Sequence, residues 1–501
     1  MLFNSWQFVF LFLPLTVLIF FQIGRARNYK FAIAWLIVAS LFFYGWWNPA
    51  YLGLLIFSIT FNYGIGKAIS QQIHPSFSPK LLLIFGVTVN LSLIGYFKYE
   101  NFFASNINQI LGTEIHLNTM ILPLAISFFT FEQIAYLVDV YKGETKEDSF
   151  LSYSLFVTFF PRLIAGPIIR HQEVMPQFAN PSIYQFNSEN LAIGITIFLI
   201  GLCKKVLIAD HIANFGDLVF DTAASGLRLT FYEAWSGAII YSLQLYFDFS
   251  GYSDMAIGTA RIFGIKLPLN FDSPYKAVNI IDFWRRWHIT LSNFLRDYLY
   301  IPLGGNRNGE GRRSLNIMIT MLLGGLWHGA GWTFIIWGGL HGLYLIINHQ
   351  WRSFRKLLGY DLKKTYWLTR SLSCFLTFIA VVSAWVFFRA ENINVAMIIL
   401  EAMSGTKGIS FSSPTVPSTK ALTLLLLIIV WFAPNTQQLL IQHQPALTEP
   451  IAINANWSHR LFQKLQWQPT TSLGIILGIF AFIAVKTFLD APQSRFLYFN
   501  F

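Results

Sequence analysis

Long and nearly continuous apolar segments, separated by short polar ones, dominate this chain. A helix that crosses a bilayer needs about 20 mostly apolar residues. Because the apolar residues run continuously instead of alternating, the pattern predicts helices rather than the strands of a membrane barrel. The segments that fit are Phe8–Ile23, Phe31–Trp47, Tyr51–Ile69, Leu81–Tyr96, Met120–Val140, Leu191–Ala209, Tyr232–Phe249, Ile317–Trp337, Gly338–Asn348, Ser371–Phe388, Leu422–Phe432 and Thr471–Phe488.

The predicted fold class is therefore an all-α polytopic membrane protein with about eleven transmembrane helices. Several of the segments are short or contain Gly and Pro. Short or broken apolar segments are tolerated at membrane depth only inside protein or beside a wet cavity. Two segments are expected to be of this irregular kind. Ser152–Pro176, with turns at Pro161 and Gly166, is predicted to be re-entrant or interfacial. Lys276–Asn308, which mixes aromatic side chains with arginines, is predicted to form a helix at the membrane interface.

No internal repeat or linker divides the sequence, so residues 1–501 are predicted to form a single membrane domain, with an aromatic tail at residues 490–501. The first apolar segment lacks a preceding basic region and a following cleavage site. It is therefore expected to be a retained span, with Arg25, Arg27 and Lys30 on the cytoplasmic side.

Composition supports a membrane protein, because 54% of the residues are hydrophobic and only 12% are charged, against about 25% in soluble domains. The net charge of +11 is better explained by basic cytoplasmic loops beside lipid headgroups than by nucleic-acid binding. The two cysteines, Cys203 and Cys374, lie in apolar segments and provide neither a disulfide framework nor a metal-ligand spacing.

Histidines within the apolar segments are the first candidates for chemistry. A charged side chain at the centre of a bilayer costs about 2.5–3.5 kcal/mol, and imidazole is the side chain best suited to move a proton near neutral pH. His328, in the sequence Leu326-Trp327-His328-Gly329, and His288, at the end of a polar block, are the two candidates. The alternative for each is a histidine that is only hydrogen-bonded to a neighbouring helix.

His341 is a weaker candidate. It follows His328 by 341 − 328 = 13 residues, which on one continuous helix places the two about 20 Å apart and on largely opposite faces. They could serve one reacting atom only if the helix broke at Gly338-Gly339.

A metal site is not expected, because the sequence contains no H-E-x-x-H or C-x-x-C spacing. Asp248 and Asp254 are carboxylates in an apolar segment, six residues apart, which places them about 240° apart around a helix. They form no dyad unless the helix bends at Gly251. Structural roles, as hydrogen-bonding partners of backbone or arginine, are favoured, and coupling to an ion is the alternative.

Arginines gather around the polar block, and guanidinium groups bind phosphates bidentately. They could hold the phosphates of a nucleotide-bearing acyl donor at the cytoplasmic face, or simply face lipid headgroups. The candidates are Arg285, Arg286, Arg296 and Arg307, with Arg312 and Arg313 nearby.

Five ordered motifs resemble the membrane-bound O-acyltransferase family, and they extend over much of the chain. They are residues 160–170 (FPRLIAGPIIR), 246–254 (YFDFSGYSD), 283–292 (FWRRWHITLS), 296–306 (RDYLYIPLGGN) and 326–329 (LWHG). The most similar branch is the bacterial one that contains the membrane subunit of alginate O-acetyltransferase and the D-alanyl transfer protein of teichoic acid. The resemblance implies a ring of tilted helices around a central tunnel, with His328 at the catalytic position and His288 at the second polar position.

The resemblance also implies a reaction, in which an acyl group, most simply acetyl, passes from a cytoplasmic thioester such as acetyl-CoA to a hydroxyl outside the membrane. His328 would act as general base, and His288 or a backbone group would orient it or stabilise the oxyanion. The donor is a co-substrate, and no tightly bound cofactor is expected. The expected location is the cell (inner) membrane, and the expected partners are an extracytoplasmic acyltransferase or hydrolase-like protein and an exported polysaccharide of unidentified type.

The tail ends in Arg495-Phe496-Leu497-Tyr498-Phe499-Asn500-Phe501, which resembles a terminal aromatic motif of the same branch, whose tyrosine is thought to carry the acyl group. A phenol ionises near pKa 10, so its ester stays activated, and Tyr498 is a candidate acyl relay. An interfacial aromatic anchor is the alternative. Two other functions remain open for the whole chain: a secondary transporter that uses Asp248 and Asp254, or a non-catalytic subunit of a polysaccharide export complex.

Overall fold

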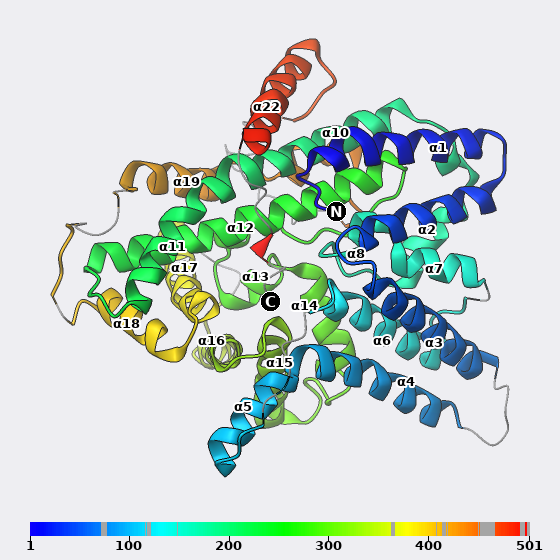
Figure 1. The fold of residues 1–501 in the computed structure, drawn as a ribbon. Coiled ribbons are helices and arrows are strands. Elements are labelled where there is room, and N and C mark those ends of the chain that lie inside the picture. Colours follow the sequence, from blue (N-terminus) through cyan, green and yellow to red (C-terminus); the bar gives the residue numbers. More distant parts are fainter. Residues whose placement is uncertain are drawn as a thin grey trace.

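The structure is a computed structural model, and it describes residues 1–71, 78–115, 117, 122–147, 149–361, 366–406, 408–412, 417, 419–448, 450, 466–490 and 496–497. Within these residues every regular element is helical (Figure 1). This confirms the predicted all-α fold class.

The α-helices of the first half are α1 (Leu13–Arg25), α2 (Tyr29–Gly45), α3 (Tyr51–Gln71), α4 (Pro79–Ile94), α5 (Glu100–Leu111), α6 (Ile126–Lys142), α7 (Phe150–Thr158), α8 (Phe160–Leu163), α9 (His171–Phe178), α10 (Ser188–Cys203), α11 (Asp210–Ala224) and α12 (Phe231–Ile262). Those of the second half are α13 (Ile280–Trp284), α14 (Ile289–Leu295), α15 (Gly309–His328), α16 (Trp332–Leu357), α17 (Trp367–Arg389), α18 (Ile393–Ser404), α19 (Lys420–Phe432), α20 (Thr436–Leu439) and α22 (Thr471–Asp490). The π-helical segments are η1 (Gln7–Phe12), η2 (Gly95–Tyr99), η4 (Lys204–Ala209) and η6 (Arg296–Tyr300), and the 3-10 turns are η3 (Pro181–Tyr184), η5 (Pro274–Lys276) and η7 (Ile441–His443).

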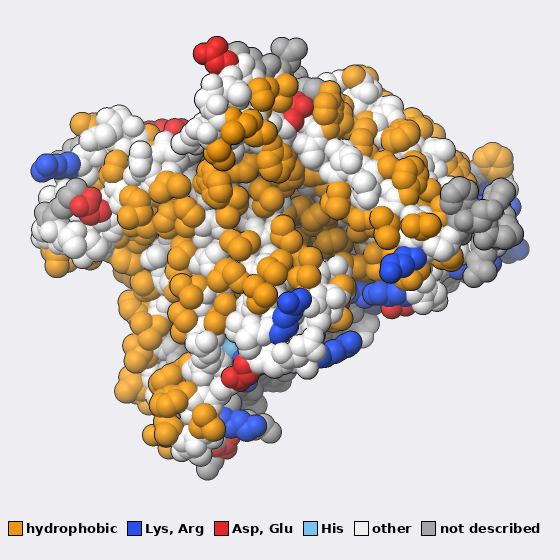
Figure 2. Space-filling view, turned by 90° about the horizontal axis from the view of Figure 1, so that it is seen from below, with side chains coloured by type: hydrophobic (Ala, Val, Ile, Leu, Met, Phe, Trp, Pro, Cys, Tyr) orange, Lys and Arg blue, Asp and Glu red, His pale blue; other side chains and the backbone are white. Residues whose placement is uncertain are grey.

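Six of the described helical segments are long and apolar enough to cross a membrane: Gln7–Arg25, Tyr51–Gln71, Pro79–Leu111, Ser188–Ala224, Trp367–Arg389 and Thr471–Asp490. Three shorter apolar helices accompany them: Tyr29–Gly45, Ile393–Ser404 and Lys420–Phe432. Hydrophobic side chains form broad areas on the face shown in Figure 2, whereas Lys and Arg side chains are few and lie in small groups. The chain is therefore a multi-pass membrane protein, and the expected count of about eleven crossings remains a prediction.

The longest helix, α12, crosses the middle of the molecule and packs closely on α10 (Figure 1). At this crossing a Cβ atom on Gly201 would lie 2.5 Å from the carbonyl oxygen of Gly251, so only glycine allows the two backbones to approach this closely. α12 continues through Gly251 without interruption. The bend that would have brought Asp248 and Asp254 together is therefore absent.

Each of these two aspartates has its own lysine partner on η4. Lys205 Nζ lies 2.5 Å from Asp248 Oδ1, and Lys204 Nζ lies 2.6 Å from Asp254 Oδ2. Both lysines lie on the π-helical segment η4, where the angle between consecutive side chains differs from the about 100° of an α-helix. The predicted structural pairing is found, but the cations are lysines rather than arginines. Asp248 also accepts the expected backbone hydrogen bond, from Leu497 N (3.0 Å).

The polar segment Lys276–Asn308 does not form the single interfacial helix that the sequence predicts. It contains η5, α13, α14 and η6, and the chain turns at His288, whose φ is 42°. Phe283 and Trp287 are each 1% exposed, so these two aromatic side chains pack inside the protein instead of facing headgroups. A mixture of aromatic residues and arginines occurs both in interfacial helices and in buried segments with polar turns. This pattern alone therefore does not distinguish the two.

The other irregular segment, Ser152–Pro176, contains parts of α7 and α9 and all of α8, and most of it is buried. Arg162 of α8 forms a buried ion pair with Glu132 of α6, which compensates the charge of a guanidinium inside the bundle. The interruptions of regular helix that the sequence predicts in this segment are present. Its re-entrant character remains a prediction.

The condition set for His328 and His341, a helix break at Gly338-Gly339, is not met, because α16 is continuous through both residues. The chain turns instead between α15 and α16, at Gly329-Ala330-Gly331. His328 therefore ends one helix and His341 lies within the next. The distance argument, which assumed one continuous helix, does not apply to them.

Candidate functional site

His328 is the last residue of α15, and its side chain is enclosed by aromatic rings. It is 3% exposed. Its ring centroid lies 4.8 Å from that of Trp327, 5.1 Å from that of Trp337 and 5.2 Å from that of Phe388. An imidazole in such surroundings is held in its neutral form by desolvation, which is the form that can accept a proton.

The end of α15 is held by the middle of another long helix, formed by α4, η2 and α5. Lys98 Nζ donates to the carbonyl oxygens of Trp327 (2.6 Å) and His328 (3.2 Å), and Tyr99 Oη donates to that of Leu326 (2.7 Å). The last carbonyls of a helix have no intrahelical partner and carry partial negative charge. Lys98 and Tyr99 satisfy them, so they fix the backbone position of His328.

We expect Lys98→Met to lower the rate of the acyl transfer that the motif resemblance implies by about 10–100-fold, because a hydrogen bond from a charged group contributes about 1.5–3 kcal/mol. Tyr99→Phe, which removes one neutral hydrogen bond worth about 0.5–1.5 kcal/mol, should have a smaller effect. Initial rates with a labelled acyl donor, at equal protein level in membranes, measure both variants. A Lys98→Met rate equal to that of wild type would show that the α15 carbonyls need no cation.

His288 is fully buried in the turn between α13 and α14, with Asn270 as its partner. His288 Nδ1 lies 3.1 Å from Asn270 Oδ1, which also accepts from Thr290 N (3.3 Å) and Thr290 Oγ1 (3.0 Å). Because a backbone N–H donates to this amide oxygen, Oδ1 is the acceptor, and Nδ1 of His288 must carry the hydrogen. In the neutral ring Nε2 is then unprotonated and can accept a proton or a hydrogen bond.

His288 is 0% exposed, and burial disfavours the charged form of an imidazole, so the ring is neutral near pH 7. His288 and His328 both pack against the ring of Trp327, with centroid distances of 6.2 and 4.8 Å. The structure thus brings the two candidate histidines together around one tryptophan.

His341 is fully buried on the same side of α16 as Trp337, which it contacts at 4.9 Å. It also lies 5.2 Å from the ring of Trp284 and 5.8 Å from that of Tyr344. Neither ring nitrogen of His341 has a hydrogen-bond partner among the described residues. Trp337 separates it from His328, so His341 lines the surroundings of the site.

The four candidate arginines do not form one cluster of available cations. Arg286 Nε donates to Asp282 Oδ1 (2.9 Å), and Arg296 Nε donates to Asp297 Oδ1 (2.6 Å), so both are engaged with carboxylates. Arg285 and Arg307 are exposed. An exposed guanidinium can bind phosphate without first breaking an internal ion pair.

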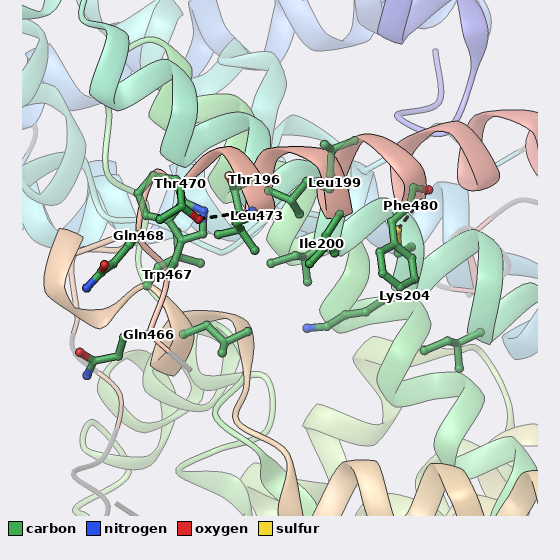
Figure 3. A pocket seen from close by; sticks show the side chains of 16 residues that line it. Thr196, Leu199, Ile200, Lys204, Gln466, Trp467, Gln468, Thr470, Leu473 and Phe480 are labelled. Carbon is green, nitrogen blue, oxygen red and sulfur yellow. Dashed lines mark hydrogen bonds between the residues drawn. The ribbon is translucent and has the colours of Figure 1, made fainter. Parts of the chain in front are cut away.

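The candidate relay Tyr498 lies outside the described residues. A separate pocket of about 750 Å³ lies between α10 and α22, lined mostly by apolar side chains and by Lys204 (Figure 3). None of the candidate histidines or arginines lines it. It therefore does not bear on the histidine chemistry.

Three residues that hold the two histidines, Lys98, Tyr99 and Asn270, were not predicted from sequence. Lys98 could have been found, because it is an isolated lysine within a largely apolar stretch, in Gly95-Tyr96-Phe97-Lys98-Tyr99. Asn270 carries no comparable signal. Its contact with His288 depends on the irregular path of the chain after α12.

Comparison with known proteins adds an independent result. Residues 146–388 match the model of the membrane-bound O-acyltransferase family. This range contains α12 and both candidate histidines, His288 and His328.

Several curated proteins are similar to this chain. The peptidoglycan O-acetyltransferase of Helicobacter pylori is 44% identical over all of this chain and 98% of its own length. The probable alginate O-acetylase of Pseudomonas aeruginosa is 42% identical over 80% of this chain and 75% of its own. The teichoic acid D-alanyltransferase of Streptococcus thermophilus is 28% identical over 55% of this chain and 69% of its own.

Proposed function

Because the chain belongs to the membrane-bound O-acyltransferase family, we propose that it moves an acetyl group from a cytoplasmic thioester to a hydroxyl outside the membrane. It is a multi-pass membrane acyltransferase. The observation that carries the proposal is the packing of two buried histidines, His288 and His328, against Trp327. Buried neutral imidazoles are suited to accept the proton that a hydroxyl loses as it attacks an acyl carbon.

In the proposed reaction His328 accepts the proton of the acceptor hydroxyl as its oxygen attacks the thioester carbonyl. The new C–O bond forms, the C–S bond breaks, and the leaving thiolate takes a proton from the His328 imidazolium. His288 Nε2 is an acceptor when Nδ1 donates to Asn270, so it cannot donate to an oxyanion. We therefore assign His288 the role of orienting the hydroxyl or the second imidazole.

The proposed membrane arrangement is a ring of about eleven transmembrane helices around a central tunnel, in the cell (inner) membrane. Six long apolar helices and three shorter ones support repeated crossing. The short, buried helices α13 and α14 support an irregular centre. In this arrangement the tunnel leads donor and acceptor to His328 from opposite sides.

The proposed donor is acetyl-CoA or another acyl thioester, used as co-substrate without a tightly bound cofactor. Arg285 and Arg307, which are exposed, are the favoured ligands for its phosphates. Arg286 and Arg296 would first have to leave Asp282 and Asp297. They are weaker candidates for this role.

The proposed acceptor is an extracytoplasmic glycan. Two relatives match along the whole chain: the peptidoglycan O-acetyltransferase of Helicobacter pylori at 44% identity and the probable alginate O-acetylase of Pseudomonas putida at 38%. The higher identity of the first favours peptidoglycan over alginate. A hydrolase-like or acyltransferase protein outside the membrane is the proposed partner. It would take the acetyl group from the tail and pass it to the glycan.

We further propose that Tyr498 carries the acetyl group between the tunnel and this partner. A phenyl ester is more activated than a sugar ester, because the phenol is the stronger acid. Inverted membrane vesicles supplied with radiolabelled acetyl-CoA should therefore place label on the tail peptide, whereas right-side-out vesicles should not. Tyr498→Phe should remove this label and the acetylation of the glycan.

Tyr366→Phe is the matched control, because Tyr366 is exposed and lies far from the tail in sequence. It should label normally. Full acetylation of the glycan by Tyr498→Phe would overturn the relay. If no label appears with wild type, the donor is wrong, and uptake of substrate dependent on Asp248 and Asp254 would favour a transporter.

A further inference from the structure

Two residues of the 490–501 tail are packed against α12 in the interior of the protein. Phe496 is 1% exposed, and its ring lies 4.5 Å from that of Tyr252 in an edge-on arrangement. The backbone N–H of Leu497 donates to Asp248 Oδ2 (3.0 Å). A short red segment beside α12 in Figure 1 corresponds to this part of the chain. An aromatic anchor at the membrane surface would instead leave the Phe496 ring exposed.

The tail contacts Lys205 and Asp248, which form a buried ion pair. Lys205 and Asp248 side chains are each 2% exposed and lie 2.5 Å apart, and Lys205 Nζ also lies 2.8 Å from Asp210 Oδ1. Lys205 Nζ is 4.6 Å from the centroid of Phe496, a cation–π distance. The pair therefore offers both a carboxylate oxygen for the tail backbone and a cation for the tail ring.

We propose that Lys205 and Asp248 form the binding site that holds the tail inside the helical bundle and positions it for acyl transfer. The positioning role rests on the proposed function. Asp248 divides its two oxygens: Oδ1 binds Lys205, and Oδ2 binds the backbone of Leu497. Leu497 immediately precedes the candidate relay Tyr498 in the chain, so the site fixes the tail one residue before the acceptor.

The same stretch of α12 also contacts the histidine site. Phe249, which follows Asp248, lies 4.7 Å from the His288 ring in an edge-on arrangement. The tail site and the histidine site thus contact two consecutive residues of α12, Asp248 and Phe249.

The neighbouring pair, Lys204 and Asp254, provides a natural control. It lies on the same two elements and is also largely buried, with Nζ and Oδ2 2.6 Å apart. Its other hydrogen bonds are with α20: Thr436 Oγ1 lies 2.9 Å from Lys204 Nζ and 2.6 Å from Asp254 Oδ2, and Gln437 Nε2 donates to Asp254 Oδ1 (3.5 Å). This pair thus binds α20, whereas Lys205 and Asp248 bind Phe496 and Leu497.

Hydrogen–deuterium exchange of the full-length protein in detergent, read on the peptide that contains Phe496 and Leu497, tests the site. We expect slow exchange in wild type and about tenfold faster exchange or more in Asp248→Leu, since a charge-assisted hydrogen bond is lost. Asp248→Asn keeps an acceptor oxygen and should retain most of the protection. Asp254→Leu should exchange at the wild-type rate. Should Asp248→Leu fail to fold, Phe496→Ala tests the same contact from the tail side.

Equal exchange in wild type and Asp248→Leu, or equally fast exchange in Asp254→Leu, would overturn the tail-binding site. Label transfer from radiolabelled acetyl-CoA to the glycan is measured on the same preparations. Transfer should fall in Asp248→Leu and recover in Asp248→Asn, and normal transfer with a fast-exchanging tail would overturn the positioning role. If wild type transfers no acetyl group but shows the expected exchange pattern, the proposed function fails while the tail-binding site stands.

Discussion

His328→Ala is expected to lower acetyl transfer by about 10²–10⁴-fold, the range in which a positioned general base contributes. The reason is chemical: a hydroxyl is a weak acid, so its oxygen attacks slowly unless a base takes the proton. His328 is 3% exposed and surrounded by aromatic rings, so water cannot easily replace it. Membranes that contain wild type or variant at equal level, incubated with radiolabelled acetyl-CoA, give the comparison.

His328→Gln is the second variant, because glutamine fills part of the space and keeps a polar group without acting as a base. It should be as inactive as His328→Ala. His341→Phe is the matched control, a buried histidine on α16 that packs on Trp337. Replacing one planar ring by another of similar size should change the rate by no more than about threefold. Full activity of both His328 variants would remove this residue from the mechanism and favour a non-catalytic subunit.

The sequence predicted the helical class because apolar runs are a direct consequence of the surrounding lipid. Segments such as Tyr51–Ile69 match the observed α3 (Tyr51–Gln71) within two residues. The residues at which one helix ends and the next begins were harder to predict. Gly338 and Gly339 fit a break by composition, but α16 passes through them, and the turn lies at Gly329-Ala330-Gly331. A glycine that permits a turn and a glycine that permits close packing look identical in a single sequence.

The π-helical segments were also beyond sequence reasoning. η2 carries Lys98, and η4 carries both Lys204 and Lys205. A π turn changes which side chains share a face, so helical periodicity gives the wrong partners for residues around it. This is why the lysine partners of Asp248 and Asp254 were not predicted.

The histidine site was predictable in part. The cost of an ionisable side chain in an apolar segment singled out His328 and His288, and the structure packs both against Trp327. The free-energy cost of an ionisable side chain in an apolar segment indicates which residues must have a structural or functional role there. It does not identify the residues that hold them, such as Asn270, which is an ordinary polar residue in a loop.

A second large loss of acetyl transfer is expected from a substitution at the crossing of α15 and α16. A Cβ atom on Gly338 would lie 2.2 Å from the carbonyl oxygen of Met321 and 3.2 Å from Cα of Gly325. Backbone atoms cannot move aside as a flexible side chain can, so Gly338→Ala must push the two helices apart. α15 ends at His328, so this displacement reaches the site. Misplacement of a reacting group by about 1 Å can cost about 100-fold in rate.

We therefore expect Gly338→Ala to lower acetyl transfer by about 100-fold and to destabilise the protein by about 1–3 kcal/mol, as overpacking of a core does. Gly339→Ala is the matched control one residue away, because its added Cβ would meet only Leu322 Cδ2, at an ordinary 3.4 Å. It should keep the wild-type rate. The thermal unfolding midpoint in detergent and the initial rate with labelled acetyl-CoA measure the two effects. Equal behaviour of the two variants would mean that the helices can separate at Gly338 without moving His328, and that the crossing does not position the site.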